Sequence, residues 1–385
     1  MGRQLDRKFW KGKRILVTGH TGFKGSWLCL MLHELGAKIY GMSNEFPSAP
    51  NMFQSLDIVN CIQEHFYGYN LSQSCPKDIL GLLNRWKPDV VIHLAAQPIV
   101  SAAWENPHFT FENNIMANLN LLDALAQYRK GPGECSHFAA VMITTDKVYD
   151  NFDSRPWERR RERDSMVPYK PYDASKACCE ILNKSYGTMT GLNNHLSSVR
   201  AGNVFGGGDW AQNRLFADMM KGLISNKVVE FKSLFSVRPW QHVLSALEGY
   251  LFVAEELYNE NFSEHLKHCM DSFSQYGDPL GWWKEFNFGP DTEDCTTIGE
   301  IADKLSVILK NKKWFHYSHY ESHPTSDTSF LDIDSTKAKR VLGWRPRIKL
   351  DMALEMFVTW VKAYKKSPDA ALKLTQKQIK EFIDV

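Results

Sequence analysis

The sequence predicts an α/β protein, in which helices cover both faces of a doubly wound parallel sheet and a smaller C-terminal domain follows. Three observations support this prediction. Short apolar runs alternate with helical patterns through the first half of the chain, a glycine-rich turn follows the first run, and the pattern changes after Gly206. Regular alternation of strands and helices is typical of a parallel sheet with helical crossovers. A chain of 385 residues can bury the core that this arrangement needs.

The expected strands are the apolar runs of the first half, at residues 14–18, 37–42, 65–69, 89–94, 138–144 and 196–200. The helix after the first strand is expected to end at Gly36, because glycine readily adopts the left-handed conformation found just after helices. Its expected buried side carries Trp27, Leu28, Leu30, Met31 and Leu35. Residues 11–200 should form the sheet domain, with 240–285 returning to it. The smaller domain should consist mainly of residues 201–239 and 286–385.

Composition indicates an ordinary soluble enzyme-sized protein. Apolar residues make up 43% of the chain and charged residues 23%, and the net charge is +2. That charge creates no field that would recruit nucleic acid, and no apolar run reaches the ~18 residues needed to cross a bilayer. The eight cysteines form no Cys-x-x-Cys pair, which indicates reduced thiols, and the charged N-terminal segment does not resemble a signal peptide. We therefore expect a cytoplasmic protein without nucleic-acid or membrane partners.

The polar segments of the chain are not expected to bind ligands. The arginine-rich run 158–164 is expected to be a solvated loop rather than a phosphate site, and residues 259–283 an inserted surface loop. Two histidine groups lack familiar metal-ligand spacing, so no metal is expected. They are His265, His268 and Cys269, and His316, His319 and His323.

Gly19, Gly22 and Gly25 follow the first expected strand and open the helix after it. Glycines let the backbone approach a pyrophosphate, and a helix N-terminus offers free N–H groups and a favourable dipole. This strand–turn–helix context predicts a dinucleotide site of the Rossmann type. A tight turn without a ligand is the alternative.

The end of the second strand bears on which dinucleotide is bound. It carries Ser43, Asn44 and Glu45, with neither an Asp for the adenosine ribose nor an Arg for a 2′-phosphate. This favours NAD over NADP.

Tyr172 and Lys176 form a Tyr-x-x-x-Lys pair, which places both side chains on one face of a helix, one turn apart. A phenol with a pKa of ~10 is a poor base at neutral pH, and a nearby ammonium lowers that pKa by stabilising phenolate. With Thr145 at the end of an intervening strand, the pair predicts proton transfer coupled to redox chemistry.

These motifs resemble those of the extended short-chain dehydrogenase/reductases and, more narrowly, the CDP-glucose 4,6-dehydratases. The resemblance runs from Phe9 to about Pro346. Its most specific stretches begin at Gly19 (GHTGFKGSW), His93 (HLAAQP), Thr145 (TDK), Arg200 (RAGNV), Gly206 (GGGDW), Arg238 (RPWQHV), Asn287 (NFGP) and Leu342 (LGW).

The resemblance implies an NAD-dependent lyase of deoxysugar biosynthesis, in particular for lipopolysaccharide O-antigen, that works as a homodimer on CDP-glucose or a related nucleotide sugar. Oxidation at C4, loss of the 6-hydroxyl as water and reduction at C6 would form a closed redox cycle. The implied catalytic residues are Thr145, Asp146, Lys147, Tyr172 and Lys176. The implied cofactor contacts are Gly19, Thr21, Gly22, Phe23, Gly25, Asn70, Leu71, Leu94, Ala95, Ala96, Gln97, Asn114, Tyr172 and Lys176. The implied substrate contacts are Asn203, Asp209, Trp210, Arg214 and Arg238, while Trp210 and Trp240 are open to a packing role.

In this resemblance Asp146 is the acid that protonates the leaving 6-hydroxyl, and a group near Lys147 takes the C5 proton. A lysine of ordinary pKa is protonated at neutral pH, so Lys147 is either a base with a lowered pKa or a charged stabiliser of the enolate, with Tyr172 or another group as the base. Two further readings remain: another nucleotide-sugar 4,6-dehydratase or 4-epimerase of the same fold, and a non-catalytic dinucleotide-sensing protein.

The chain departs from the family pattern in positions that bear on the substrate. They are Ser101, Ala103 and Trp104 after the His93 stretch, Lys170 before Pro171, Asn213 before Arg214, and Lys232, Ser233 and Leu234. A substituted sugar or a different nucleotide is therefore compatible with the sequence.

Overall fold

We analysed a computed structural model of the chain, which describes residues 3–131, 137–151, 158–231, 234–259, 284–317 and 329–384. Within these residues the fold centres on a seven-stranded parallel sheet with the order β11-β6-β5-β4-β1-β2-β3. Its strands are β1 (Arg14–Thr18), β2 (Lys38–Ser43), β3 (Glu64–Tyr67), β4 (Val90–His93), β5 (Ala139–Ile143), β6 (Leu196–Ala201) and β11 (Phe286–Phe288). The six strands expected from the sequence are confirmed to within a few residues.

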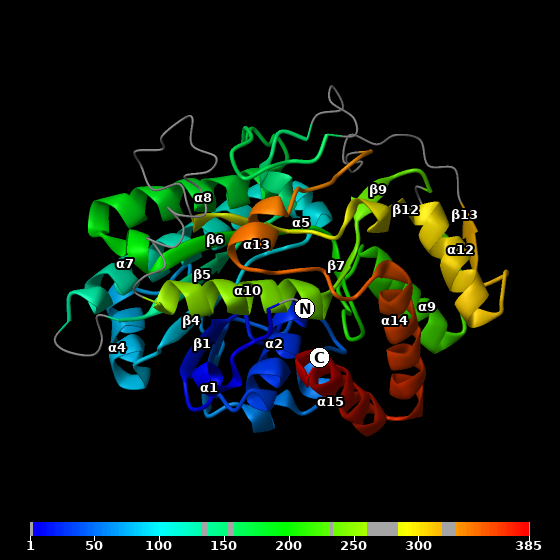
Figure 1. Ribbon diagram of the computed structural model, residues 1–385, viewed down its shortest axis with the longest axis horizontal. Coiled ribbons are helices and arrows are strands. Elements are labelled where there is room, and N and C mark those ends of the chain that lie inside the picture. Colours follow the sequence, from blue (N-terminus) through cyan, green and yellow to red (C-terminus); the bar gives the residue numbers. More distant parts are fainter. Residues whose placement is uncertain are drawn as a thin grey trace.

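The sheet is buried on both faces, as its strand sequences require. In β1, Ile15 and Val17 belong to one apolar cluster while Leu16 belongs to another, because successive side chains point to opposite faces. Helices α2 (Phe23–Glu34) and α10 (Val243–Tyr258) cover the first face. Helices α4 (Pro76–Trp86) and α7 (Ala117–Arg129) cover the second, with α8 (Pro171–Thr190) packed beside α7 (Figure 1).

Helix α2 explains how the first strand leads into the glycine turn. Gly22 is its N-cap, and Gly36 follows its end with φ of +78°, as expected. The helix is buried on every side from Gly25 to Leu32, rather than on one stripe. The C-terminal helix α15 (Pro368–Asp384) packs back against it, which explains the additional burial.

The rest of the chain builds small elements beside the sheet (Figure 1). Within the described residues, three two-stranded sheets pair β10 with β7, β12 with β9, and β13 with β8. Their strands are β7 (Val204–Phe205), β8 (Val229–Phe231), β9 (Val237–Pro239), β10 (Gln241–His242), β12 (Cys295–Thr297) and β13 (Phe315–Tyr317). The helices are α9 (Leu215–Ser225), α12 (Ile298–Leu309), α13 (Thr336–Val341) and α14 (Leu350–Lys366). Short helices elsewhere are α1 (Arg7–Trp10), α3 (Met52–Ser55), α5 (Val100–Glu105) and α6 (Pro107–Phe111).

Strand β11 and helix α15 lie in the range that we assigned mainly to the smaller domain, yet β11 extends the main sheet beside β6. The division into two domains stays a proposal. Among the described residues, no helix combines the length and the apolar character needed to span a membrane. The expected insertion at 259–283 lies, apart from residue 259, outside the described residues.

The arginine-rich run is only in part the solvated loop expected from its sequence: Glu158, Arg161 and Arg163 are exposed, whereas Arg159 and Arg160 are covered. Arg159 pairs with Asp332 at 2.7 Å, and Arg160 is 7% exposed and forms a β-bridge with Ile333. Glu162 accepts a hydrogen bond from the backbone of Asn287 at 2.9 Å. The charges are therefore used to attach this segment to β11 and to the chain before α13.

Candidate active site

A cavity of about 880 Å³ opens at the carboxyl ends of the strands, where a doubly wound sheet places its ligands. Gly19 follows β1, Ser43 ends β2, Leu94 follows β4 and Thr144 follows β5, and all four line the cavity. The order of the sheet reverses between β1 and β4, so their connecting segments diverge and leave space between them.

The glycine turn lies against one wall of this cavity, and its backbone positions exclude side chains. A Cβ atom on Gly19 would lie 2.7 Å from the backbone nitrogen of Ala95, and Gly19 has φ of +72°. A Cβ atom on Gly25 would lie 2.3 Å from the carbonyl oxygen of Gly19. The turn leads directly into α2, whose N-terminal N–H groups face the turn. This arrangement fits the pyrophosphate of a dinucleotide.

Most of the expected cofactor contacts line the same cavity. They are Gly19, Thr21, Gly22, Phe23, Gly25, Asn70, Leu71, Leu94, Ala95, Ala96, Gln97, Tyr172 and Lys176. Asn114 is instead buried behind the lining, where its side chain accepts from the backbone of Gln97 at 2.7 Å and donates to Ser175 at 2.9 Å. Asn114 thus connects a lining loop to helix α8.

The end of β2 lies where an adenosine ribose is expected. Ser43, Asn44 and Glu45 line the cavity. The Ser43 hydroxyl lies 2.9 Å from Nδ1 of His20, and the hydroxyl of Thr21 donates to the Glu45 carbonyl at 2.8 Å. These hydrogen bonds hold the first two βα loops together.

Tyr172 and Lys176 both face the cavity from the first turns of α8. The Lys176 ammonium donates to the carbonyl oxygen of Ile143 at 3.1 Å, which fixes it at the end of β5. Burial lowers the pKa of Lys176, while the Glu180 carboxylate one turn further along α8 raises it. Burial raises the pKa of Tyr172, which Arg214 and a hydrogen bond with the Thr145 side chain oppose. In this structure, therefore, Arg214 and Thr145 counteract the desolvation of the phenolate but do not overcome it.

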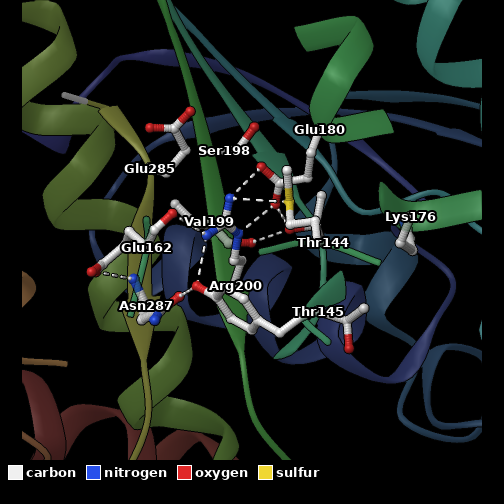
Figure 2. A network of polar contacts seen from close by, with 12 residues as sticks. Thr144, Thr145, Glu162, Lys176, Glu180, Ser198, Val199, Arg200, Glu285 and Asn287 are labelled. Atoms are coloured by element: carbon white, nitrogen blue, oxygen red, sulfur yellow. Dashed lines mark hydrogen bonds and ion pairs between the residues drawn. The ribbon is translucent and has the colours of Figure 1, made fainter. Parts of the chain in front are cut away.

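A buried polar network supports α8 from behind (Figure 2). Arg200 on β6 is completely buried and forms two hydrogen bonds with Glu180, at 2.8 and 2.9 Å. Burial raises the pKa of the Glu180 carboxyl, but the charge and hydrogen bonds of Arg200 outweigh it and the pKa is lowered. Glu180 also accepts from the hydroxyl of Thr144 at 2.5 Å. The carboxylate thus joins the helix that carries Lys176 to the strand end that carries Thr145.

The same guanidinium extends the network to the far edge of the sheet. Arg200 donates to the hydroxyl of Tyr149 at 2.6 Å, and Tyr149 donates to the side chain of Asn287 on β11 at 2.7 Å (Figure 2). Sequence reasoning singled out Arg200 and Asn287 as family motifs without a role for either. Their role is to connect β6, β11 and α8 in the interior.

The Thr145-Asp146-Lys147 triplet begins at the end of β5 and forms the turn η4 (Asp146–Val148). The Thr145 hydroxyl donates to the Asp146 carboxylate at 3.0 Å. Asp146 is buried and acts on the pKa of Tyr172, so these two groups lie close together. Lys147 is half-buried. Among the described residues, none of the three is part of the cavity lining itself, which Tyr172 provides at this point.

The other end of the cavity carries three of the expected substrate residues, Asp209, Trp210 and Arg214. Arg214 pairs with Asp209 at 3.2 Å and is about one-third exposed, so its other nitrogens remain accessible from the cavity. Trp210 lines the cavity, whereas the indole of Trp240 is buried and donates to the Thr296 carbonyl at 3.2 Å. Trp240 is therefore a packing residue.

Two expected substrate residues do not line the cavity in the described structure. Asn203 is half-buried, and its carbonyl accepts from Gln241 at 3.0 Å. Arg238 is 3% exposed and donates to the carbonyl oxygens of Val237 and Ser329, at 2.7 and 3.5 Å. A substrate role for either residue stays a prediction.

Two of the departures from the family pattern meet at the cavity. The side chain of Asn213, which has φ of +57°, donates to the Ser101 hydroxyl at 2.9 Å, and both residues line the cavity. Of the others, Ala103 is buried in α5, Lys170 is buried at the N-cap of α8, and Lys232 and Ser233 lie outside the described residues.

Sequence reasoning missed Lys24 as a site residue, although it quoted the motif that contains it. Lys24 lines the cavity from the first turn of α2, and its ammonium donates to the hydroxyl of Tyr250 at 3.3 Å. Tyr250 is completely buried on α10. The signal available in the sequence was a lysine between Phe23 and Gly25, directly within the glycine turn.

Within the described residues, no group of three or more His, Cys, Asp or Glu side chains could hold a metal ion. His265, His268, Cys269, His319 and His323 lie outside those residues.

Comparison with known proteins places the chain in a family of NAD-dependent enzymes, which agrees with the dinucleotide site described above. A family described as "Epimerase: NAD dependent epimerase/dehydratase family" matches residues 15–266. The chain belongs to this family, which confirms the expected NAD cofactor and the expected α/β fold.

More narrowly, the chain is 36% identical to CDP-glucose 4,6-dehydratase of Salmonella typhimurium, over 98% of either chain. It is 25% identical to UDP-glucose 4-epimerase of Mycolicibacterium smegmatis, over 88% of this chain and 95% of that one. Among solved structures, dTDP-glucose 4,6-dehydratase of Bacillus anthracis in complex with NAD shares the fold, with a TM-score of 0.68 and 20% identity over 94% of this chain and 100% of that one.

Proposed function

We propose that the protein is a lyase that converts CDP-glucose to CDP-4-keto-6-deoxyglucose without net consumption of NAD. One observation carries the proposal: the Tyr172–Lys176 pair at the cavity wall has Asp146 beside it, an acid that oxidation alone does not need. The 36% identity with a CDP-glucose 4,6-dehydratase over nearly the whole chain supports the nucleotide and the sugar.

Bound NAD would accept the hydride from C4 of the hexose and return it to C6. Tyr172 would remove the proton of the 4-hydroxyl, with the Thr145 hydroxyl bonded to the same oxygen and the Lys176 ammonium stabilising the phenolate. The new ketone acidifies the C5 hydrogen. Asp146, protonated for this step, would donate its proton to the leaving 6-hydroxyl, and water departs.

The polar end of the cavity supports a diphosphate substrate. A guanidinium can form two parallel hydrogen bonds with phosphate oxygens. Arg214 lines the cavity, is about one-third exposed and is held in place by Asp209. Lys221 also lines the cavity and adds a second positive charge there. We assign this end to the nucleotide diphosphate.

The assay that tests the proposal is incubation of purified protein with NAD and a panel of CDP-, dTDP-, GDP- and UDP-hexoses, followed by quantification of the 4-keto-6-deoxy product. We expect CDP-glucose to be converted with NAD unchanged at the end. Conversion of another nucleotide sugar with none of CDP-glucose would transfer the assignment to another 4,6-dehydratase. A product that keeps its 6-hydroxyl would instead make the protein a 4-epimerase.

We further propose that the protein works as a homodimer in the cytoplasm, in deoxysugar biosynthesis for lipopolysaccharide O-antigen. The outer side of α8 supports the dimer, since Ile181 and Met189 are 58% and 69% exposed there. Exposed apolar side chains on one helix favour contact with a second copy. Analytical ultracentrifugation of the NAD-bound protein would show twice the chain mass if the dimer forms.

A further inference from the structure

The loop between β7 and α9, residues 206–214, carries the groups at the polar end of the cavity. Arg214 pairs with Asp209 at 3.2 Å, and Trp210 lines the cavity beside them. The backbone of Ala211 donates to the Asp209 carboxylate at 3.1 Å, which fixes the turn before Arg214. The contacts that hold this loop therefore decide where its charged groups meet the substrate.

The start of the loop is packed too tightly for side chains. A Cβ atom on Gly207 would lie 2.0 Å from the indole ring of Trp360 on α14, so the ring rests directly on the glycine backbone. A Cβ atom on Gly208 would lie 2.6 Å from the sulfur of Met52 on α3, and Gly208 has φ of +87°. Trp27 on α2 donates its indole N–H to the Gly207 carbonyl at 2.9 Å. Only glycine fits this close approach to α14, α3 and α2.

Trp360 is itself fixed by the C-terminal helices. It is completely buried, and its indole N–H donates to the Thr375 hydroxyl on α15 at 2.9 Å. Tyr364, one turn further along α14, stacks on it with ring centroids 5.2 Å apart and an angle of 12° between the rings. Tyr364 also packs against Trp210, with ring centroids 5.2 Å apart. Helix α14, which lies against both α9 and α15 (Figure 1), thus supports the loop at Gly207 and again at Trp210.

We propose that Trp360 is a positioning residue for substrate binding: by fixing the loop at Gly207, it sets where Arg214 presents its guanidinium to the diphosphate of the nucleotide sugar. The inference rests on the proposed function. Trp360 is not part of the described cavity lining, so it acts through the loop alone. Two parallel hydrogen bonds to a phosphate require a particular orientation of the guanidinium, which makes binding sensitive to the position of the loop.

A double-mutant cycle tests whether the ring and the loop act together. Gly207→Ala places a methyl group against the ring and should displace the loop, whereas Trp360→Ala removes the ring. Each should raise KM for CDP-glucose, by up to about 10²-fold, an effect that a displacement of roughly 1 Å can have. The value of kcat should change little, because the diphosphate lies away from the reacting carbons. In the Trp360→Ala background, Gly207→Ala should add little, because its methyl group no longer meets the ring.

Two further variants separate positioning from general stability. Trp360→Phe keeps an aromatic ring against Gly207 but loses the N–H that donates to Thr375, and it should restore KM to near the wild-type value. Trp314→Ala is the matched control, since Trp314 is also a buried indole that donates to a hydroxyl, that of Ser306 at 2.9 Å, outside the cavity lining. Trp314→Ala should lower the free energy of unfolding without raising KM.

Binding measured without turnover separates this inference from the proposed function. Calorimetric titration of the NAD-saturated protein with CDP should rank the variants as KM does. The affinity for NAD should stay near the wild-type value, because the turn at Gly19 is held by its own contacts with Ala95. If Trp360→Ala does not fold, Gly207→Ala decides the matter, since it leaves the core filled.

Several outcomes would overturn the proposal. They are unchanged CDP affinity in Gly207→Ala, fully additive effects in the double variant, and an equal rise in KM in Trp314→Ala. A parallel loss of NAD affinity would mean that the variants loosen the whole molecule. If the wild-type protein binds CDP but forms no 4-keto-6-deoxy product, the proposed reaction fails, while the CDP titrations still test the role of Trp360. Failure of the wild-type protein to bind CDP, UDP, GDP or dTDP would overturn both.

Discussion

At the scale of single residues, the protonation states in the site depend on burial as much as on neighbouring charge. Tyr172 and Lys176 are one turn apart on α8, yet burial raises the pKa of the phenol and lowers the pKa of the amine. Both shifts favour the neutral forms, as expected when a low-dielectric site destabilises charge. A bound dinucleotide and substrate would change these surroundings, since they bring phosphates and displace water.

Tyr172→Phe should abolish C4 oxidation while leaving NAD binding largely intact. The phenol supplies the proton acceptor, and the loss of general-base catalysis typically costs about 10²–10⁴-fold in rate. Turnover of CDP-glucose and titration of NAD binding measure the two effects separately. Tyr186→Phe on the same helix is the matched control, because Tyr186 lies outside the cavity lining and packs against the cluster beneath α7. Near-normal turnover in Tyr172→Phe would remove this residue from the mechanism.

Asp146→Asn should slow elimination much more than oxidation. The amide keeps the shape of the carboxyl group and can still accept from Thr145, but it has no carboxylic proton for the leaving hydroxyl. Rapid-quench analysis should show a 4-keto hexose that keeps its 6-hydroxyl. Equal losses in both steps would indicate a structural role for Asp146 instead.

At the scale of elements, α8 is held in place by a buried ion pair rather than by apolar packing alone. Arg200 and Glu180 are both completely buried, and Glu180 also binds Thr144 at the end of β5. Breaking such a pair leaves an uncompensated buried charge, which typically costs about 3–5 kcal/mol. The pair therefore couples the position of Lys176 to that of the Thr145 strand end.

Glu180→Gln should narrow the pH range of C4 oxidation. The carboxylate raises the pKa of Lys176, so its removal lowers that pKa further and the ammonium is lost at a lower pH. The alkaline limb of the rate profile should move to lower pH, and weaker stabilisation of phenolate should move the acid limb upward. Single-turnover oxidation rates measured across pH provide the test.

The control for this variant is Ser198→Ala, which removes a buried hydrogen bond between α8 and β6 further from Lys176. Asn183 on α8 donates to Ser198 at 2.8 Å. This control should lose some stability without a shift in either limb. A profile shifted equally in both variants would mean that general loosening of α8 is responsible.

At the scale of the whole molecule, buried histidines make the stability of the fold depend on pH. His242 is the N-cap of α10, where its Nδ1 accepts from the backbone of Leu244 at 3.3 Å and its ring packs against Trp27. Burial lowers its pKa to about 3. In the unfolded chain the pKa should be about 6.5. The unfolded state therefore binds the proton first as the pH falls, and stability is lost between those two values.

His242→Asn should reduce this loss. Asparagine can still accept the capping hydrogen bond but does not titrate. Between about pH 6.5 and about pH 4, the free energy of unfolding should fall by roughly 3 kcal/mol less in the variant than in the wild-type protein. Urea denaturation at several pH values measures the difference. Glu248, whose pKa is raised to about 7, has the opposite effect on stability as the pH falls, but it is present in both proteins and does not contribute to the difference. Parallel stability curves would show that His242 is not the group that titrates.

The sequence by itself determined the parts of the fold that depend on neighbours along the chain. The six strands, the glycine turn with its helix, and the Tyr172–Lys176 pair follow from periods of two and 3.6 residues and from backbone conformations that glycine favours. Thirteen of the expected cofactor residues line one cavity: eleven follow the carboxyl ends of the parallel strands β1, β3 and β4, and Tyr172 and Lys176 reach it from α8. The resemblance to a known family, carried by the sequence motifs, then supplied the expected catalytic roles.

The tertiary structure alone decided which distant groups meet. The arginine-rich run looked like a wholly solvated loop because its partners, Asp332 and Asn287, lie more than 120 positions away. Lys24 looked like part of a glycine turn until α10 brought Tyr250 to it. Burial of such groups is a property of the folded chain, and burial sets their pKa values, so no local pattern could reveal which lysine can lose its proton near neutral pH.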